Sequence, residues 1–378
     1  MRNLLVCFLL ASLILAACSP APGPGAATPT PGATAAPGST DVPTPEVPQA
    51  TAAPTATLPP RPSGPLTEPA MLDRYALESG HTGVSVAAGG GMVWAGTNLG
   101  QVFAFDAASG EVSRVYELAE GSLADPAPVQ ALAYDGARVW ALVRSTREGT
   151  LYKTLAVLDP ASGETVATFD VTDDDPDHLL AANGQVWTQN RIWDAQTLES
   201  TPLPMATDSS VFAWDGQGMW VGGAATTCDT CEQLLYRYAG GTLSAGPAYS
   251  QQVLGLAIAG DHLWVLTGFN TLDGYALGAG LEIDSQPEER IELSGDHDTP
   301  PAATLFDGTR LWLLGAAGKG SGRVFYHDPA SGKKLGGVIV GDSSESSFNA
   351  SIPVDLAYDG TDLWVLTAMH LVRVGLPE

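Results

Sequence analysis

One pattern recurs seven times along this chain: an apolar stretch, a turn that contains glycine, and a second apolar stretch that carries a tryptophan. Successive tryptophans of the pattern lie 33 residues apart at the closest, from Trp187 to Trp220, and 52 at the widest, from Trp312 to Trp364. A recurrence near about 40 to 50 residues with strand–turn–strand content is typical of β-propeller blades. The seven equivalent tryptophans are Trp94, Trp140, Trp187, Trp220, Trp264, Trp312 and Trp364.

Each repeat contains the signals for two hairpins. An Asp-Gly or Asn-Gly pair joins the first two strands in most copies, because these residues tolerate positive φ. A second turn follows, as Asp-Ala-Ala-Ser-Gly at 106–110 and as Asp-Pro-Ala-Ser-Gly at 159–163 and 328–332. We therefore predict an all-β fold, a seven-bladed β-propeller of four-stranded antiparallel blades.

The last repeat lacks its fourth strand, since it ends near Leu371–Val374. The segment Leu72–Leu77, at the start of the domain, is similar to the fourth strand expected at Val112–Leu118. We therefore expect the N-terminal strand to complete the last blade, which removes an open sheet edge. The propeller domain then comprises residues 66–378.

The first 65 residues have a different composition. Arg2 precedes an apolar run from Leu4 to Ile14 that is too short to span a bilayer. The following Leu15-Ala16-Ala17-Cys18 resembles a bacterial lipobox, which implies a signal peptide at 1–17 and a lipid on Cys18. An ordinary cleaved signal peptide is the alternative. Residues 18–65 are rich in Pro, Thr and Ala, so we expect a disordered tether and an extracytoplasmic protein, lipid-anchored to the bacterial cell envelope.

The turn sequences carry a resemblance to known propellers. The Asp-Ala-Ala-Ser-Gly and Asp-Pro-Ala-Ser-Gly turns resemble those of quinoprotein-like (PQQ-type) and YVTN-type propellers. The phrase Asp-Gly-Thr-Asp-Leu-Trp-Val at 359–365 is similar to virginiamycin B lyase-like propellers. The resemblance implies a fold rather than an activity. Quinoprotein dehydrogenases usually have eight blades and often adjacent cysteines, so we expect no bound quinone here.

The charge of the chain narrows its partners. The net charge is −25 and the sequence pI is about 4.3. Such a surface repels phosphate backbones, which excludes nucleic acid as a partner. A protein, a peptide or a carbohydrate stays open as the ligand, and we expect the propeller to be monomeric.

Turn lengths predict that the two faces of the ring differ. The turns inside the two hairpins of each repeat are short and define a short-turn face, while the longer connections gather on a long-loop face, where binding sites concentrate. His81, His178 and His297 precede innermost strands on that face, and Asp298 follows one of them. We predict that they reach the channel mouth as candidate ligands of a transition metal. The alternative is that they are solvated loop residues that never meet.

Two further loops on the long-loop face carry candidate chemistry. Asp173, Asp174, Asp175 and Asp177 form an acidic run that offers oxygen ligands for calcium, although the run lacks an EF-hand spacing and also fits a solvated loop. Cys228 and Cys231 lie in one loop, and outside the cytoplasm a local disulfide is the favoured interpretation.

No complete catalytic set appears in the sequence. There is no Gly-x-Ser-x-Gly in a strand–turn–helix context. We therefore expect a binding scaffold that acts through the long-loop face, and we do not expect an enzyme. The alternative is a metal-assisted lyase or hydrolase with its site at the channel mouth. Calcium or a transition metal stays open as a cofactor.

Overall fold

The computed structural model describes residues 66–204, 208–224, 233–249, 252–268, 270–279, 281, 285–293, 303–316, 322–341 and 352–377. Cys18, Cys228, Cys231, His297 and Asp298 lie outside these ranges. Within the described ranges, no helix has the length and apolar character needed to cross a bilayer.

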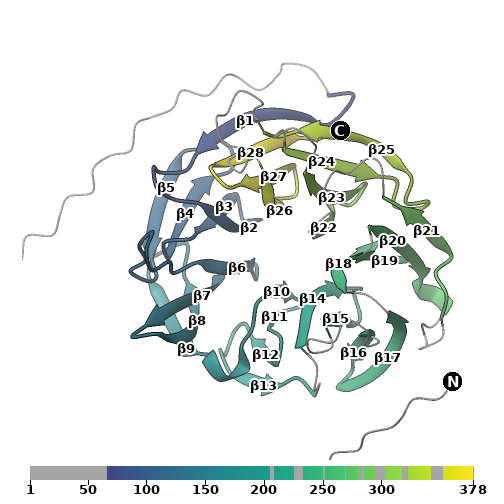
Figure 1. The fold of residues 1–378 in the computed structure, drawn as a ribbon, viewed down its shortest axis with the longest axis horizontal. Coiled ribbons are helices and arrows are strands. Elements are labelled where there is room, and N and C mark those ends of the chain that lie inside the picture. Colours follow the sequence, from purple (N-terminus) through teal and green to yellow (C-terminus); the bar gives the residue numbers. More distant parts are fainter. Residues whose placement is uncertain are drawn as a thin grey trace, which may run out of the picture. The chain divides into compact units, whose positions relative to one another are not determined.

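The described residues form seven four-stranded antiparallel sheets that stand around a ring as blades (Figure 1). Short 3-10 turns occur at η1 (Thr172–Asp174) and η2 (Leu277–Ala279). The predicted seven-bladed, all-β propeller is confirmed.

The strands of each blade are given from the inner to the outer edge. Blade 1 is β2 (Gly83–Gly89), β3 (Met92–Thr97), β4 (Gln101–Asp106) and β5 (Val112–Glu117), and blade 2 is β6 (Val129–Tyr134), β7 (Val139–Arg147), β8 (Thr150–Leu158) and β9 (Thr165–Asp170). Blade 3 is β10 (Leu180–Ala182), β11 (Gln185–Trp187), β12 (Arg191–Asp194) and β13 (Ser200–Pro202). Blade 4 is β14 (Asp208–Trp214), β15 (Met219–Ala224), β16 (Gln233–Ala239) and β17 (Thr242–Tyr249). Blades 5 and 6 are β18 (Val253–Ala259), β19 (His262–Thr267), β20 (Thr271–Ala276) and β21 (Glu289–Glu292); and β22 (Ala303–Phe306), β23 (Leu311–Ala316), β24 (Gly322–His327) and β25 (Lys334–Ile339). Blade 7 is β26 (Pro353–Tyr358), β27 (Asp362–Thr367), β28 (His370–Gly375) and β1 (Ala70–Ala76).

Blade 7 joins the two ends of the domain. Strand β1 pairs antiparallel with β28, from Ala70 opposite Gly375 to Ala76 opposite His370. Tyr75 of β1 stacks on Trp364 with ring centroids 6.0 Å apart. The predicted closure by the N-terminal strand is therefore confirmed, with a start at Ala70 instead of Leu72.

The repeated tryptophans lie in the second strands and are almost fully buried. In blade 2, Trp140 Nε1 donates to Asp135 Oδ2 at 2.7 Å. The other oxygen of Asp135 accepts the backbone N–H groups of Ala137 and Arg138 at 2.8 and 2.7 Å. One carboxylate thus fixes both the turn and the core tryptophan. The same bond to the indole is made by Asp215, Asp307 and Asp359 in blades 4, 6 and 7.

The second turn of the repeat connects neighbouring blades. In blade 6, Gly332 has a φ of +63°, and a Cβ there would lie 2.6 Å from Trp264 of blade 5. Trp264 Nε1 donates to Pro329 O of the same turn at 2.9 Å. In blade 3 the equivalent left-handed position is taken by Leu198, with a φ of +63°. These turns form the short-turn face.

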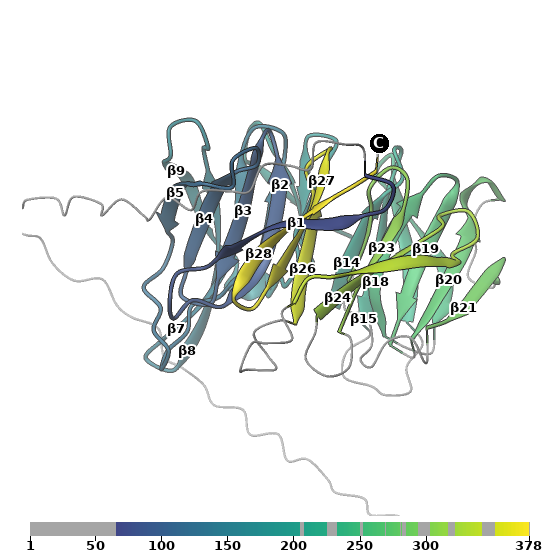
Figure 2. The same cartoon turned by 90° about the horizontal axis from the view of Figure 1, so that it is seen from above.

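The long-loop face is at the opposite end of the blades, and one hairpin extends there beyond the usual blade length. Strands β7 and β8 have nine residues each, and they are labelled at the lower left of the ribbon in Figure 2, below the other strand labels. Their pairing continues from Val139–Leu158 to Arg147–Thr150. The added pairs bring Lys153 next to the loop that connects blade 2 to blade 3.

Candidate functional site

Lys153 stands at the base of the extended hairpin and is buried, with 4% of its side chain exposed. The adjoining loop continues the strand ladder, because Val171 N–H donates to Lys153 O at 2.9 Å. Thr172 accepts Lys153 N–H on its hydroxyl oxygen at 3.0 Å. The start of the acidic loop is therefore fixed to the blade by main-chain and side-chain bonds.

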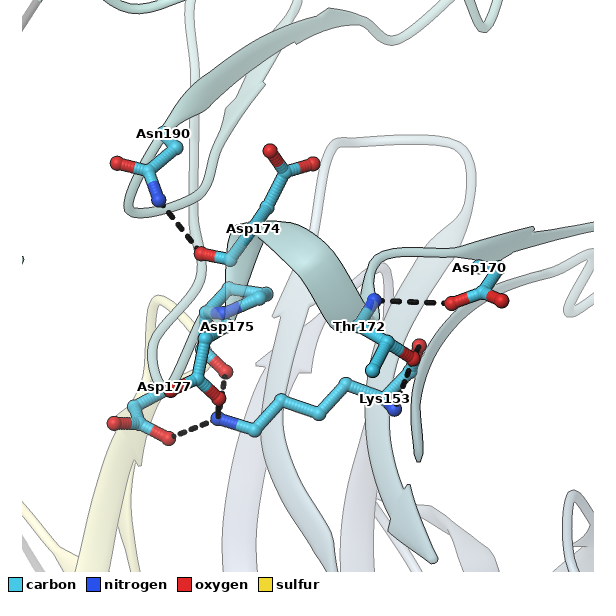
Figure 3. A network of polar contacts seen from close by, with 8 residues as sticks. Lys153, Asp170, Thr172, Asp174, Asp175, Asp177 and Asn190 are labelled. Carbon is cyan, nitrogen blue, oxygen red and sulfur yellow. Dashed lines mark hydrogen bonds and ion pairs between the residues drawn. The ribbon is translucent and has the colours of Figure 1, made fainter. Parts of the chain in front are cut away.

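The ammonium group of Lys153 holds the other end of the loop (Figure 3). Its Nζ lies 2.6 Å from Asp175 Oδ1 and 2.6 Å from Asp177 Oδ1, and it donates to Pro176 O at 2.9 Å. A lysine ammonium has three donors. All three have an oxygen partner, which explains how a cation can be buried at this position.

The middle of the acidic loop is held from blade 3. Asn190 Nδ2 donates to Asp174 O at 2.6 Å (Figure 3), and Arg191 Nε pairs with the Asp174 carboxylate. At the loop's start, Asp170 accepts Thr172 N–H at 3.0 Å, and hydrogen bonds from Thr172 lower the pKa of Asp170. The loop is thus bonded to blade 2 and to blade 3, so it forms a fixed surface.

The acidic run is therefore organised around a lysine and an arginine. Asp174, Asp175 and Asp177 each have a cation as partner, whereas Asp173 is exposed and has no ion pair among the residues described. No group of three His, Cys, Asp or Glu side chains arranged to hold a metal ion occurs in the described part of the chain. Because ammonium and guanidinium groups occupy the positions beside these carboxylates, the geometry of the loop gives the calcium prediction no support.

His81 packs into the seam between blades 7 and 1. The side chain is buried, its ring meets Phe103 edge-on at 5.5 Å, and Nδ1 lies 3.3 Å from Glu78 O. Phe103 is on the third strand of blade 1, away from the inner edge. The His81 side chain thus packs between strands of neighbouring blades, and it does not lie at the channel mouth as predicted.

His178 has a different environment, at the inner end of the acidic loop. Solvent reaches the residue, yet surrounding protein desolvates the imidazole and lowers the pKa of His178. Its neutral form is therefore favoured near neutral pH. Because His297 and Asp298 lie outside the described residues, their meeting with His178 stays a prediction.

His178 lies two residues before the start of β10, so its position in the repeat is obtained by continuing the register of that strand backwards. Each repeated tryptophan has a cross-strand partner on the innermost strand of its blade. The residue two positions before that partner is equivalent in all seven blades and lies at the inner edge of the ring. The seven residues are Ser85, Ala131, His178, Val211, Gly255, Ala303 and Asp355. Ser85 and Asp355 both bond to the inner strand of the next blade, to Val129 O at 2.7 Å and to Val86 N–H at 2.8 Å. The side chains of Ser85 and Asp355 thus face the inner strand of the next blade.

Asp355 is the acidic member of this inner-edge set. Its carboxylate accepts the backbone N–H groups of Val86 and Leu356, each at 2.8 Å. Desolvation by the surrounding blades nevertheless raises the pKa of Asp355 to about 6. Such a carboxyl group changes charge within the physiological range.

Comparison with known proteins supports the fold alone. No family model and no curated protein matches the chain. The solved structure of Ika8, a computationally designed protein, is similar at TM-score 0.52 and 14% identity, over 80% of this chain and all of that one. The structure of U3-55K is similar at TM-score 0.60 and 12% identity, over 83% of this chain and all of that one.

Sequence reasoning missed the residues that organise the site. Lys153 sits in the strand Thr150–Leu158 and resembles an ordinary solvated lysine. Two sequence signals could have marked it: lysine is rare in this chain, and the third strand of this repeat is longer than the others. Asp355 gave a weaker signal, since an aspartate in an inner strand is unusual between Val354 and Leu356.

Proposed function

We propose that this protein is an extracytoplasmic, lipid-anchored binding scaffold whose long-loop face takes a basic segment of a peptide or protein. A propeller provides a rigid ring that fits a binding role in general. The observation that carries the proposal is the acidic loop 170–178, which is fixed by Lys153 from blade 2 and by Arg191 from blade 3.

The charge balance of this loop supports a cationic partner. Five aspartates, at 170, 173, 174, 175 and 177, stand against two cations, Lys153 and Arg191. Excess carboxylate charge on an already ordered loop attracts Lys and Arg side chains and needs little reorganisation on binding. The net charge of −25 on the whole chain adds a long-range attraction for the same cationic partner.

A titration with two peptides tests the proposal. The full chain, in detergent, is titrated with an oligolysine decapeptide and with an oligoglutamate of equal length, at two salt concentrations. We expect binding of oligolysine alone, weakened at higher salt because charges on the surface are screened. Equal binding of both peptides would contradict a cation-specific face.

Matched variants locate the binding surface. Asp173→Asn combined with Asp175→Asn removes two carboxylates from the loop and keeps the pair of Lys153 with Asp177. Glu111→Gln combined with Glu164→Gln removes two exposed carboxylates from the short-turn face. We expect the loop variant to weaken oligolysine binding about tenfold and the control to change it less than twofold. Equal losses would mean that only the overall charge matters.

The anchor is part of the same proposal and has its own test. The lipobox at 15–18 supports acylation of Cys18. Cells fed a radiolabelled fatty acid should label the wild-type chain and leave Cys18→Ser unlabelled and released from membranes. Unlabelled wild-type chain would overturn the anchor and leave the binding face untouched. The enzyme alternative gains no specific observation from the described residues.

A further inference from the structure

A polar cavity of about 150 Å³ lies between blades 4 and 5. Tyr249 ends the outer strand of blade 4, and Thr267 ends the second strand of blade 5, so the cavity is toward the long-loop face. It is part of the wall of the ring and is separate from the acidic loop. Thr271, Asp273, Tyr275 and Arg290 also line it.

The cavity exists where blade 5 departs from the repeat. Asp273 pairs with Val265, the residue after the repeated tryptophan. In five other blades the same position holds an uncharged side chain, namely Phe103, Ala156, Tyr236, Phe325 and Val372. A buried charge at a position that these blades keep uncharged is costly, and such departures concentrate at functional sites.

The buried charge is neutralised by one arginine. Arg290 binds Asp273 through two parallel hydrogen bonds, Nε to Oδ1 and Nη2 to Oδ2, both at 2.8 Å. The Asp273 side chain is 1% exposed, while that of Arg290 is 59% exposed. A guanidinium has five N–H donors, and Asp273 takes two of them. The pair therefore makes the cavity neutral overall and leaves donors at its rim.

Hydroxyl groups complete the polar surface of the cavity. Tyr249 donates its O–H to Tyr275 at 2.7 Å, and Thr267 and Thr271 share a hydrogen bond of 2.7 Å. Tyr275 accepts that bond, and its own O–H has no acceptor among the residues described. Burial raises the pKa of both tyrosines, which keeps both as neutral hydroxyls. Each of these oxygens can accept a hydrogen bond, and Tyr275 can also donate one.

We propose that this cavity binds a neutral polyhydroxylated ligand, one monosaccharide unit. A sugar offers hydroxyls that both donate and accept, which matches the mixed donors and acceptors of the tyrosines, threonines and Arg290. A charged ligand would lose its hydration without gaining a net opposite charge in the cavity. A cavity of about 150 Å³ accommodates one six-membered ring.

Calorimetry or saturation-transfer NMR on the full chain tests the proposal, in a detergent without a sugar headgroup. Glucose, galactose and N-acetylglucosamine are the neutral probes, and glucuronate and glucosamine are the charged comparators. We expect saturable millimolar binding of at least one neutral sugar, and weaker binding of both charged ones. Absence of binding by every neutral sugar, or equal binding of a charged one, would overturn the assignment.

Two hydroxyl deletions place the ligand. Tyr275→Phe removes the free donor and retains the ring. Tyr238→Phe makes the same change at the equivalent register position of blade 4, outside the cavity. Loss of one neutral hydrogen bond weakens binding about fivefold to tenfold, and we expect that loss for Tyr275→Phe only. An unchanged affinity in Tyr275→Phe would contradict the site. Arg290→Lys, which breaks the two-bond geometry at an exposed side chain, should weaken binding as well.

Discussion

The two faces of the ring are built by different rules. On the short-turn face, the same solution recurs: an aspartate accepts the N–H groups of its turn, and a glycine takes the left-handed position. On the long-loop face, the acidic loop is held by partners that occur once, Lys153, Asn190 and Arg191. The repeat therefore specifies the scaffold, while the site depends on departures from the repeat.

The largest expected effect comes from breaking a repeated turn. In Gly332→Ala, a Cβ at a φ of +63° would also lie 2.2 Å from Ile291 and 2.6 Å from Trp264. Left-handed strain plus overpacking should lower the free energy of unfolding by about 3 kcal/mol. Gly240→Ala is the matched control, because its φ is +57° and nothing lies within 4 Å of its Cβ. Urea unfolding should show a cost of only about 1 kcal/mol for the control, and equal costs would disprove the packing argument.

A second prediction concerns the aspartate that bonds to a core tryptophan. Asp307 accepts Trp312 N–H and two turn N–H groups, whereas Asp159 caps a turn and has no indole partner among the residues described. Asp307→Asn loses a buried charged acceptor and should destabilise the fold by about 2 kcal/mol. Asp159→Asn should cost clearly less in the same thermal unfolding assay. A cost for Asp159→Asn as large as that for Asp307→Asn would show that the cap, not the indole bond, dominates.

A third prediction concerns the long-loop face, where Lys153 holds the acidic loop. Lys153→Met deletes the partner of Asp175, Asp177 and Pro176 O, and we expect a cost of about 2 kcal/mol, since the two carboxylates are exposed and water replaces part of the interaction. Hydrogen exchange should quicken in residues 171–178. Lys333→Met, at an exposed turn position, should leave both stability and exchange unchanged. Unaltered exchange in Lys153→Met would mean that the loop is fixed by its main-chain bonds alone.

The smallest effect is the pH dependence of Asp355. Its pKa of about 6 lies above the ordinary 3.8, so the folded protein holds this proton more tightly than the unfolded chain does. The associated stability is complete below about pH 4 and is lost as the pH rises through about 6. Relative to Asp355→Asn, the wild type should lose about 1 to 2 kcal/mol between pH 4 and 7, less than the full shift implies because the residue is only partly buried.

The turn aspartates titrate with the opposite sign. Hydrogen bonds from turn N–H groups hold the pKa of Asp106, Asp159 and Asp328 below the usual range. Their contribution is present above pH 3.8 and is lost as the pH falls through their folded pKa values. Carbon NMR titration of the aspartate carboxyls should separate the two groups. A pKa of Asp355 near those of the turn aspartates would contradict the claim that burial at the inner edge raises it.

The sequence by itself determined the ring. The seven tryptophans, the Asp-Gly or Asn-Gly turns of most repeats, the Asp-Pro-Ala-Ser-Gly turns and the missing last strand were sufficient to predict the blade number and the closing strand. Turn chemistry and alternation act over a few residues, so they can be read locally. The same local signals were not sufficient to place His81, whose ring packs against Phe103.

Only the tertiary structure decided which polar side chains meet. Lys153 reaches Asp177 across 24 residues, Asp355 bonds to Val86 across 269, and Asp273 shares a cavity with Tyr249 of the preceding blade. Each of these contacts depends on how far a hairpin extends or how one blade packs on the next. Because such distances follow from the packing of whole blades, no spacing pattern in the chain encodes them.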